Sequence, residues 1–177
     1  MCGPANNVVR VPKAKVQGTA TTRTGTAAAM RLEIGRAAME GDVVACFVKT
    51  EPEAWFLGRV VKTAFKANCR FKGRRGELVT EDIEHVEVQR LEEVLWKVPY
   101  SYEPNTDKDG LLYVPACNIV KCKVSLLPPK STRRSAMNVL GEEWDSMPRK
   151  EGSELLASPY LHLPLRERVE IWAVCPQ

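Results

Sequence analysis

The chain has 177 residues and a formal net charge of +4, and apolar residues make up 44% of it. This mixture is typical of a globular protein rather than of a disordered or membrane protein. No apolar run approaches the roughly 20 residues of a membrane-spanning helix, so we expect no membrane partner. Six cysteines are spread over the chain without dense spacing, and the N-terminus lacks a secretory signal, which together indicate free thiols in an intracellular compartment.

The N-terminal part of the sequence changes in character near residue 26. Residues 1–26 are rich in Thr, Gly, Pro and isolated bases, and they contain few large apolar side chains. Such a segment cannot bury enough surface to offset its chain entropy, which predicts a flexible basic arm. Residues 26–40 are rich in strong helix formers, with Met30 and Ile34 on an apolar stripe. Gly41 is placed to end this predicted helix in a left-handed conformation.

The middle of the chain has the pattern of a β domain. Between residues 41 and 128, β-branched and aromatic residues concentrate and turn-forming residues recur at short intervals. The clearest strands are residues 42–48 and 55–61, joined by a polar turn that contains Pro52. Further strands are predicted at residues 77–79, 86–91, 111–114 and 119–127.

Beyond residue 128 the sequence becomes polar and is interrupted by glycine and proline, which predicts a linker over residues 129–153. Residues 154–177 are apolar again, and a docking strand, a short helix and the start of a larger unit all stay open as alternatives. The predicted organisation is therefore a flexible basic arm (1–26), a helix followed by a β domain (27–128), and a linker with a C-terminal extension (129–177).

Three short motifs of the β region resemble a known group of folds. They are Gly-Asp-Val-Val from Gly41, Trp-Phe-x-Gly-Arg-Val-Val from Trp55, and Tyr-x-Pro-x-x-x-Ile-Val from Tyr113. This pattern resembles the SH3-like small β-barrels of the Tudor, chromo-barrel and PWWP type, over about half of the chain. The resemblance implies a mainly β, SH3-like small barrel with a preceding short helix and flexible N- and C-terminal extensions.

The resemblance also implies a function. Its members use an aromatic cage for a methylated lysine or arginine, which implies a non-enzymatic reader of a protein tail in chromatin and hence a nuclear protein. Each well-placed ring face stabilises the cation by roughly 0.5–2 kcal/mol. Neighbouring strand residues point to opposite faces, so at most one of Trp55 and Phe56 lines such a pocket. The competing interpretation makes these rings ordinary core residues. The cage candidates are Phe47, Trp55, Phe56, Tyr100, Tyr102 and Tyr113.

Residues 62–76 indicate an alternative partner. This segment contains six bases, two phenylalanines and no acidic residue. Closely spaced bases attract phosphates, and aromatic rings stack on nucleobases, so the alternative is a nucleic-acid-binding barrel that contacts DNA or RNA, such as an accessory domain of a mobile-element protein. The opposing interpretation is a solvated loop whose charge is masked by the acidic residues that follow it. The candidate residues are Lys62, Lys66, Arg70, Lys72, Arg74 and Arg75. A scaffold subunit whose two tails dock onto a larger assembly is a second alternative.

Motifs for catalysis or cofactor binding are absent from the sequence. His85 and His162 are the only histidines, and there is no glycine-rich phosphate cradle and no nucleophile motif, so we expect neither enzymatic activity nor a cofactor. Cys117 and Cys122, with Cys69 and His85, would suit zinc only if the fold brought all four together. Ordinary buried thiols are the expected alternative, so no metal site is predicted.

Overall fold

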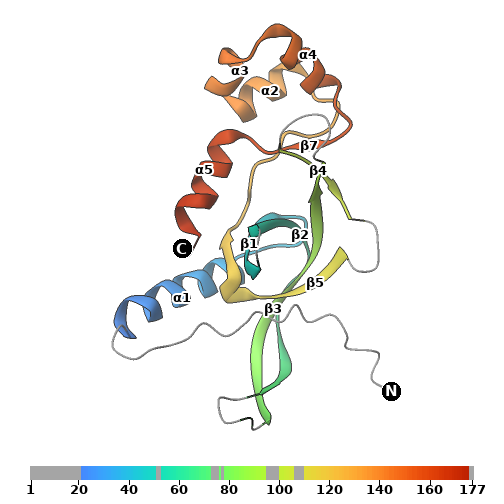
Figure 1. Cartoon of the computed structure of the whole chain (residues 1–177). Helices are drawn as coiled ribbons and strands as arrows, with labels where there is room; N and C mark the ends of the chain where they lie inside the picture. The colour runs from blue at the N-terminus through green and yellow to red at the C-terminus, as the bar shows by residue number, and fades with distance from the viewer. Residues whose placement is uncertain are drawn as a thin grey trace.

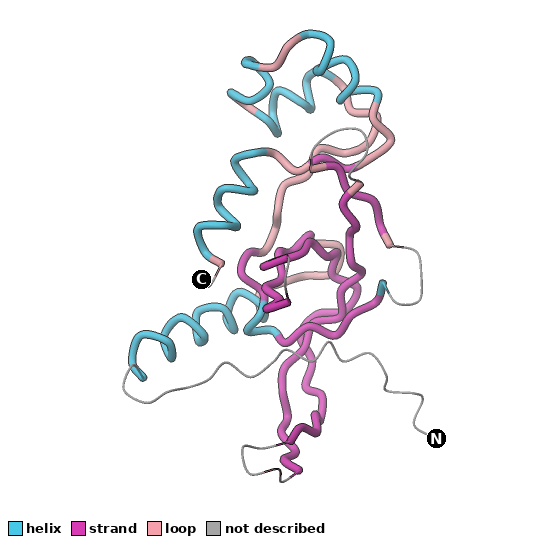
Figure 2. The backbone as a smooth tube through the Cα atoms, in the orientation of Figure 1, coloured by secondary structure: helices cyan, strands magenta, loops and turns pink. Residues whose placement is uncertain are grey.

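The structure is a computed structural model that describes residues 21–50, 53–72, 76, 78–94, 100–105 and 110–175. Seven strands form one antiparallel sheet, which confirms the predicted mainly β fold (Figures 1 and 2). The strands are β1 (Val43–Thr50), β2 (Glu53–Lys72), β3 (Leu78–Glu93), β4 (Ser101–Pro104), β5 (Leu111–Pro115), β6 (Ile119–Lys121) and β7 (Leu161–His162). The helices are α1 (Thr21–Arg36), the 3-10 helix η2 (Ala116–Asn118), α2 (Arg133–Leu140), α3 (Glu142–Ser146), α4 (Arg149–Ala157) and α5 (Leu165–Val174).

The strand order is β6-β1-β2-β3-β4-β7, with β5 pairing to β3. Strand β3 is therefore paired along both edges, to β2 on one side and to β5 and β4 on the other. Strand β6 returns to β1, where Ala45 pairs with Lys121 and Cys46 with Ile119. The sheet is not closed, and β6 and β7 lie at its two ends.

Both faces of the central strands are buried. Because side chains alternate along a strand, Cys46 and Phe56 enter one apolar cluster while Ala45 and Leu57 enter another. Helix α1 packs against the first cluster, which also holds residues of β3, β5 and β6. Helix α5 covers the second cluster, where Ile171 is fully buried.

Helix α1 approaches the backbone of η2 very closely. A Cβ atom at Gly35 would lie 2.2 Å from the carbonyl oxygen of Ala116, so only glycine fits at this point of the helix. The helix begins and ends earlier than the predicted 26–40, although Gly41 has the expected positive φ of 87°. Gly41 instead links the helix to the sheet, since its N–H donates to the carbonyl oxygen of Val60 at 2.9 Å.

The interpretation of residues 62–76 as a basic loop is wrong for residues 62–72, which belong to a strand. Strand β2 continues to Lys72, which pairs with Leu78 at the start of β3, because Phe65, Ala67 and Cys69 alternate with polar residues as a strand requires. Residues 78–79 and 86–91, which were predicted as parts of two strands, thus belong to the one strand β3, and residue 77 lies outside the described residues. The distal parts of β2 and β3, residues 65–72 and 78–85, form a hairpin arm that projects away from the helices (Figure 1).

The prediction of a linker over residues 129–153 was also wrong, because α2, α3 and most of α4 lie there. Helix α2 begins after Thr132, whose side chain accepts a hydrogen bond from the N–H of Ser135 at 3.2 Å. Its buried residues join Leu127 and Leu155 in a third apolar cluster. Among the open alternatives for residues 154–177, a strand (β7, paired to β4) and a helix (α5) are both found.

Several other predicted boundaries differ from the structure. The segment predicted as strand 119–127 is a strand only over β6, and the strands β4 and β7 were not predicted. Of the predicted basic arm, residues 1–20 lie outside the described residues, and residues 21–26 belong to α1. Among the helices of the described residues, none has the length and hydropathy needed to cross a membrane.

The close approach at Gly35 generates a stability prediction. Gly35→Ala should lower the free energy of unfolding by about 1–3 kcal/mol or more, because the added methyl group must push α1 away from Ala116. Ala29→Ser also adds one heavy atom to α1, at an exposed position, and should change stability by less than about 0.5 kcal/mol. Chemical denaturation of both variants checks this, and equal stability of the two would contradict the close contact.

Candidate functional site

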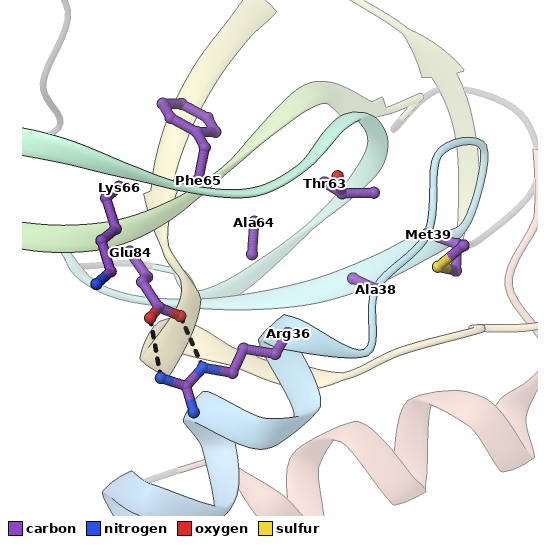
Figure 3. A pocket seen from close by; sticks show the side chains of 8 residues that line it. All are labelled: Arg36, Ala38, Met39, Thr63, Ala64, Phe65, Lys66 and Glu84. Carbon is purple, nitrogen blue, oxygen red and sulfur yellow. Dashed lines mark hydrogen bonds and ion pairs between the residues drawn. The ribbon is translucent and has the colours of Figure 1, made fainter.

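The described surface has two hollows that bear on function. The first, the α1–β2 hollow, has a volume of about 500 Å³ and lies between the end of α1 and the base of the hairpin arm (Figure 3). It is lined by Arg36, Ala38, Met39, Thr63, Ala64, Phe65, Lys66 and Glu84. Aromatic surface in it is limited to Phe65, whose ring also meets the ring of Tyr113 edge-on, with centroids 5.8 Å apart.

A paired arginine and glutamate lie at one side of the α1–β2 hollow. Arg36 Nε donates to Glu84 Oε2 at 2.7 Å, and a second guanidinium nitrogen donates to Glu84 Oε1 at 2.9 Å (Figure 3). Hydrogen bonds from Arg36 hold the pKa of the Glu84 carboxyl below its usual value, and the charge of Lys66 acts in the same direction. The charges here are thus largely satisfied within the chain, which leaves little for a ligand to pair with.

The second hollow, which we call the aromatic pocket, has a volume of about 230 Å³ and a different chemistry. Five aromatic residues, two arginines and one glutamate line it, together with two leucines. They are Trp55, Phe56, Leu57, Arg90, Leu91, Glu93, Tyr100, Tyr102, Arg168 and Trp172. These residues come from β2, β3, the start of β4 and α5, so the pocket forms only when the C-terminal helix is docked on the sheet.

Strand geometry determines which rings of the aromatic pocket a ligand can reach. Phe56 packs into the first apolar cluster, whereas Trp55 packs against the second, as the alternation along β2 requires. Both residues still contribute to the wall. Phe56 and Tyr102 are only 7% and 5% exposed, so the reachable rings are Trp55, Tyr100 and the half-exposed Trp172. Trp55 and Trp172 meet edge to face, with ring centroids 6.2 Å apart.

Two aromatic faces of the pocket already hold guanidinium groups of the same chain. The Cζ atom of Arg168 lies 3.7 Å from the centroid of the Tyr100 ring, and that of Arg90 lies 5.4 Å from the centroid of Phe56. Both distances are within the roughly 6 Å at which a cation over a ring face is attracted by it. Two cations of the chain thus already lie over rings that line the pocket.

Four of the six predicted cage residues meet in this pocket: Trp55, Phe56, Tyr100 and Tyr102. Phe47 packs against the second apolar cluster, and Tyr113 lies on β5 beside Phe65. Sequence reasoning did not find Arg90, Arg168 or Trp172. Arg168 and Trp172 are four residues apart in α5, a spacing that places both on one helix face and is visible in the sequence.

The predicted basic residues lie along β2 where the structure describes them. Lys62 and Lys66 are exposed, and the strand register places Glu87 opposite the first and Glu84 opposite the second. Arg70 and Lys72 belong to β2 by their backbone, whereas Arg74 and Arg75 lie outside the described residues. The acidic residues of β3 thus neutralise part of the positive charge at the base of the arm.

Among the cysteines and histidines that the structure describes, Cys69 and His85 form a close pair. Cys69 Sγ lies 3.8 Å from Nε2 of the buried His85, whereas Cys122 Sγ is elsewhere and donates to the carbonyl oxygen of Ile34. Burial raises the pKa of the Cys122 thiol to about 11 and lowers the pKa of the His162 imidazole. In the part of the chain that the structure describes, no three His, Cys, Asp or Glu side chains converge as metal ligands.

Comparisons with protein-family models, with curated proteins and with solved structures found no match to this chain. What the aromatic pocket can bind therefore has to follow from its own geometry and charge.

The Arg36–Glu84 pair generates a prediction about titration. Arg36→Gln should raise the pKa of the Glu84 carboxyl toward its ordinary value, and Lys66→Gln should raise it less, because Lys66 acts through its charge alone. Because the pKa of Glu84 is lower in the folded state, the pair stabilises the fold at pH values above the pKa that glutamate has in the unfolded chain. This contribution is lost as the pH falls through the pKa of Glu84 in the folded state. NMR titration of the Glu84 carboxyl carbon measures the shift. An equal response to the two substitutions would contradict the hydrogen-bonded pair.

Proposed function

We propose that the chain is a non-enzymatic binding module of the SH3-like type, which holds a cationic side chain of a protein tail in the aromatic pocket. The observation that carries this proposal is that the ring faces of the pocket hold guanidinium groups at 3.7 and 5.4 Å. Three further features support it: the reachable rings of Trp55 and Trp172, the acidic wall residue Glu93, and an opening to solvent through the half-exposed Trp172.

The strand order supports the SH3-like part of the proposal. Strands β1, β2 and β3 form an antiparallel meander, and β5, which follows β4 in the chain, pairs back onto β3. The 3-10 helix η2 then leads into β6, which returns to β1. A meander whose last strand pairs with its first has the connectivity by which a few strands curl into a small barrel. The hairpin arm and the β4–β7 pair extend this unit, and α5 adds the fourth element that lines the aromatic pocket.

The chemistry of the pocket favours lysine or arginine, methylated or not, as the residue that enters. Aromatic faces attract a cation through the ring quadrupole, and methyl groups add apolar contact with the same rings. The tail of a chromatin protein, rich in such residues, is the partner class that the proposal names. Trp172 and Trp55 would form the outer walls, and Glu93 would supply the opposite charge at the rim.

Peptide binding tests the proposal. Short peptides that are uncharged except for one central lysine, trimethyllysine, arginine or dimethylarginine are titrated into the full chain by calorimetry. A peptide with an uncharged central norleucine serves as the comparison. We expect at least one cationic peptide to bind more tightly than the norleucine peptide. Trp172→Ala should weaken this binding roughly two- to thirty-fold, the value of one cation–ring contact.

Tyr113→Ala is the matched control, because Tyr113 is a similarly exposed aromatic residue on β5 outside the pocket. It should leave the affinity unchanged. Thermal unfolding of both variants confirms that each is folded. The proposal would be contradicted if the norleucine peptide bound as tightly as all the cationic peptides. It would also be contradicted if Trp172→Ala and Tyr113→Ala lowered the affinity equally.

A second candidate function, nucleic-acid binding, is favoured by the shape of the hairpin arm. A two-stranded ribbon that projects from the fold is one of the elements that fit the major groove of DNA, and Lys62 and Lys66 are exposed at its base. The acidic residues opposite these lysines count against it.

Salt dependence separates this candidate from the leading proposal. If the arm binds nucleic acid, affinity for short single- or double-stranded DNA should fall steeply between two salt concentrations, because bound counterions are released. The double variant Lys62→Glu and Lys66→Glu should abolish that binding. The control double variant Lys130→Glu and Lys150→Glu carries the same charge change at exposed positions of the C-terminal region and should retain it. DNA affinity that does not change with salt concentration would contradict nucleic-acid binding by the hairpin arm.

A further inference from the structure

Helix α5 places a cation of the same chain on one of the rings that line the aromatic pocket. The Cζ atom of Arg168 lies 3.7 Å from the centroid of the Tyr100 ring. This distance is close to the optimal separation of two non-bonded carbon atoms, so the guanidinium group and the ring are in van der Waals contact. One of the three reachable rings of the aromatic pocket is therefore covered by Arg168.

We propose that Arg168 is a built-in competitor of the aromatic pocket, so that a ligand must displace its guanidinium group from Tyr100 in order to bind. This inference rests on the proposed function and concerns the regulation of the same site. A cationic side chain from a partner and the Arg168 side chain need the same ring face, and one face accommodates one cation. Binding is then an exchange, and its apparent affinity is lower than that of an open pocket.

The contacts of Arg168 make such an exchange possible without movement of the helix. Within the described residues, the contact recorded for its guanidinium group is the one with the ring of Tyr100. Arg166, two residues earlier, instead pairs with Glu170. The helix itself is held by the fully buried Ile171 and by ion pairs of Lys121 with Glu167 and Glu170. A rotation of the Arg168 side chain is therefore enough to open the ring, while α5 stays on the sheet.

The backbone of Tyr100, from which the ring projects, is held by the segment before α5. Tyr100 has a φ of 63°, a left-handed conformation that is uncommon for a residue with a large side chain. Its carbonyl oxygen accepts a hydrogen bond from Leu163 N–H at 2.9 Å, and Leu163 is fully buried just before α5. The chain segment that leads to Arg168 thus also holds the backbone of the residue whose ring Arg168 covers, and the surrounding structure maintains this strained backbone.

The test compares two arginine substitutions in the same helix. Arg168→Gln should tighten binding of the cationic peptides roughly two- to thirty-fold, because the ring no longer exchanges one cation for another. Arg166→Gln removes the same charge two residues earlier, where the side chain is 86% exposed and pairs with Glu170, and should leave the affinity unchanged. Calorimetry with the full chain and the same peptide set measures both.

A spectroscopic signal reports on the exchange directly. In the free wild-type chain, the Nε–Hε resonance of Arg168 should carry a ring-current shift from Tyr100, and addition of the peptide should move it to the position of a free arginine.

The peptide affinities decide between the proposals. Equal affinity of wild type and Arg168→Gln, with binding still lost in Trp172→Ala, would overturn the role of Arg168 as a competitor and leave the proposed function standing. Weaker binding in Arg168→Gln would show that Arg168 assists the ligand and would also overturn it. Absence of peptide binding in all variants, Arg168→Gln included, would overturn both.

Discussion

The alternation of side chains along β1 and β2 is the constraint on which the rest of the structure depends. Neighbouring residues such as Phe56 and Leu57 are both buried, but on opposite faces, so the sheet cannot leave either face in water. One face is covered by α1 and the curled strands, and the other by α5. The C-terminal helix α5 is therefore part of the core. The aromatic pocket lies where α5 packs beside β2 and the start of β4.

Local patterns predicted the elements whose signals are local. The apolar run and turn around β1 and the short strand β5 appear within a few residues of their predicted bounds. The extension of β2 was missed because the basic residues of this segment were taken as a sign of a loop. Small and aromatic residues nevertheless alternate with the basic ones, as in a strand. The helices α2 and α4 were missed because Gly141 and Pro148 suggested a linker, whereas these residues separate short helices that bury only a few side chains each.

The candidate site was predictable in part, for a physical reason. Trp55 and Phe56 adjoin in the sequence, and Tyr100 and Tyr102 stand out as aromatic residues farther along the same domain, so composition alone drew attention to them. Their convergence depends on the pairing of β3 with β4, and the last wall of the pocket depends on the docking of α5. Pairing between distant segments leaves no mark in a single sequence, which is why Arg168 and Trp172 escaped notice until the fold placed them beside the rings.

The layout of the sheet also has a consequence for the order in which the chain folds. The β2–β3 hairpin joins neighbouring segments and needs only a short loop to close, whereas β1 meets β6 across most of the domain. Loop-closure entropy opposes the second pairing more strongly than the first, so the hairpin is the expected nucleus and the return of β6 the slow step. The charged side chains along the arm then protect its open edges from pairing with other molecules while the remaining strands assemble.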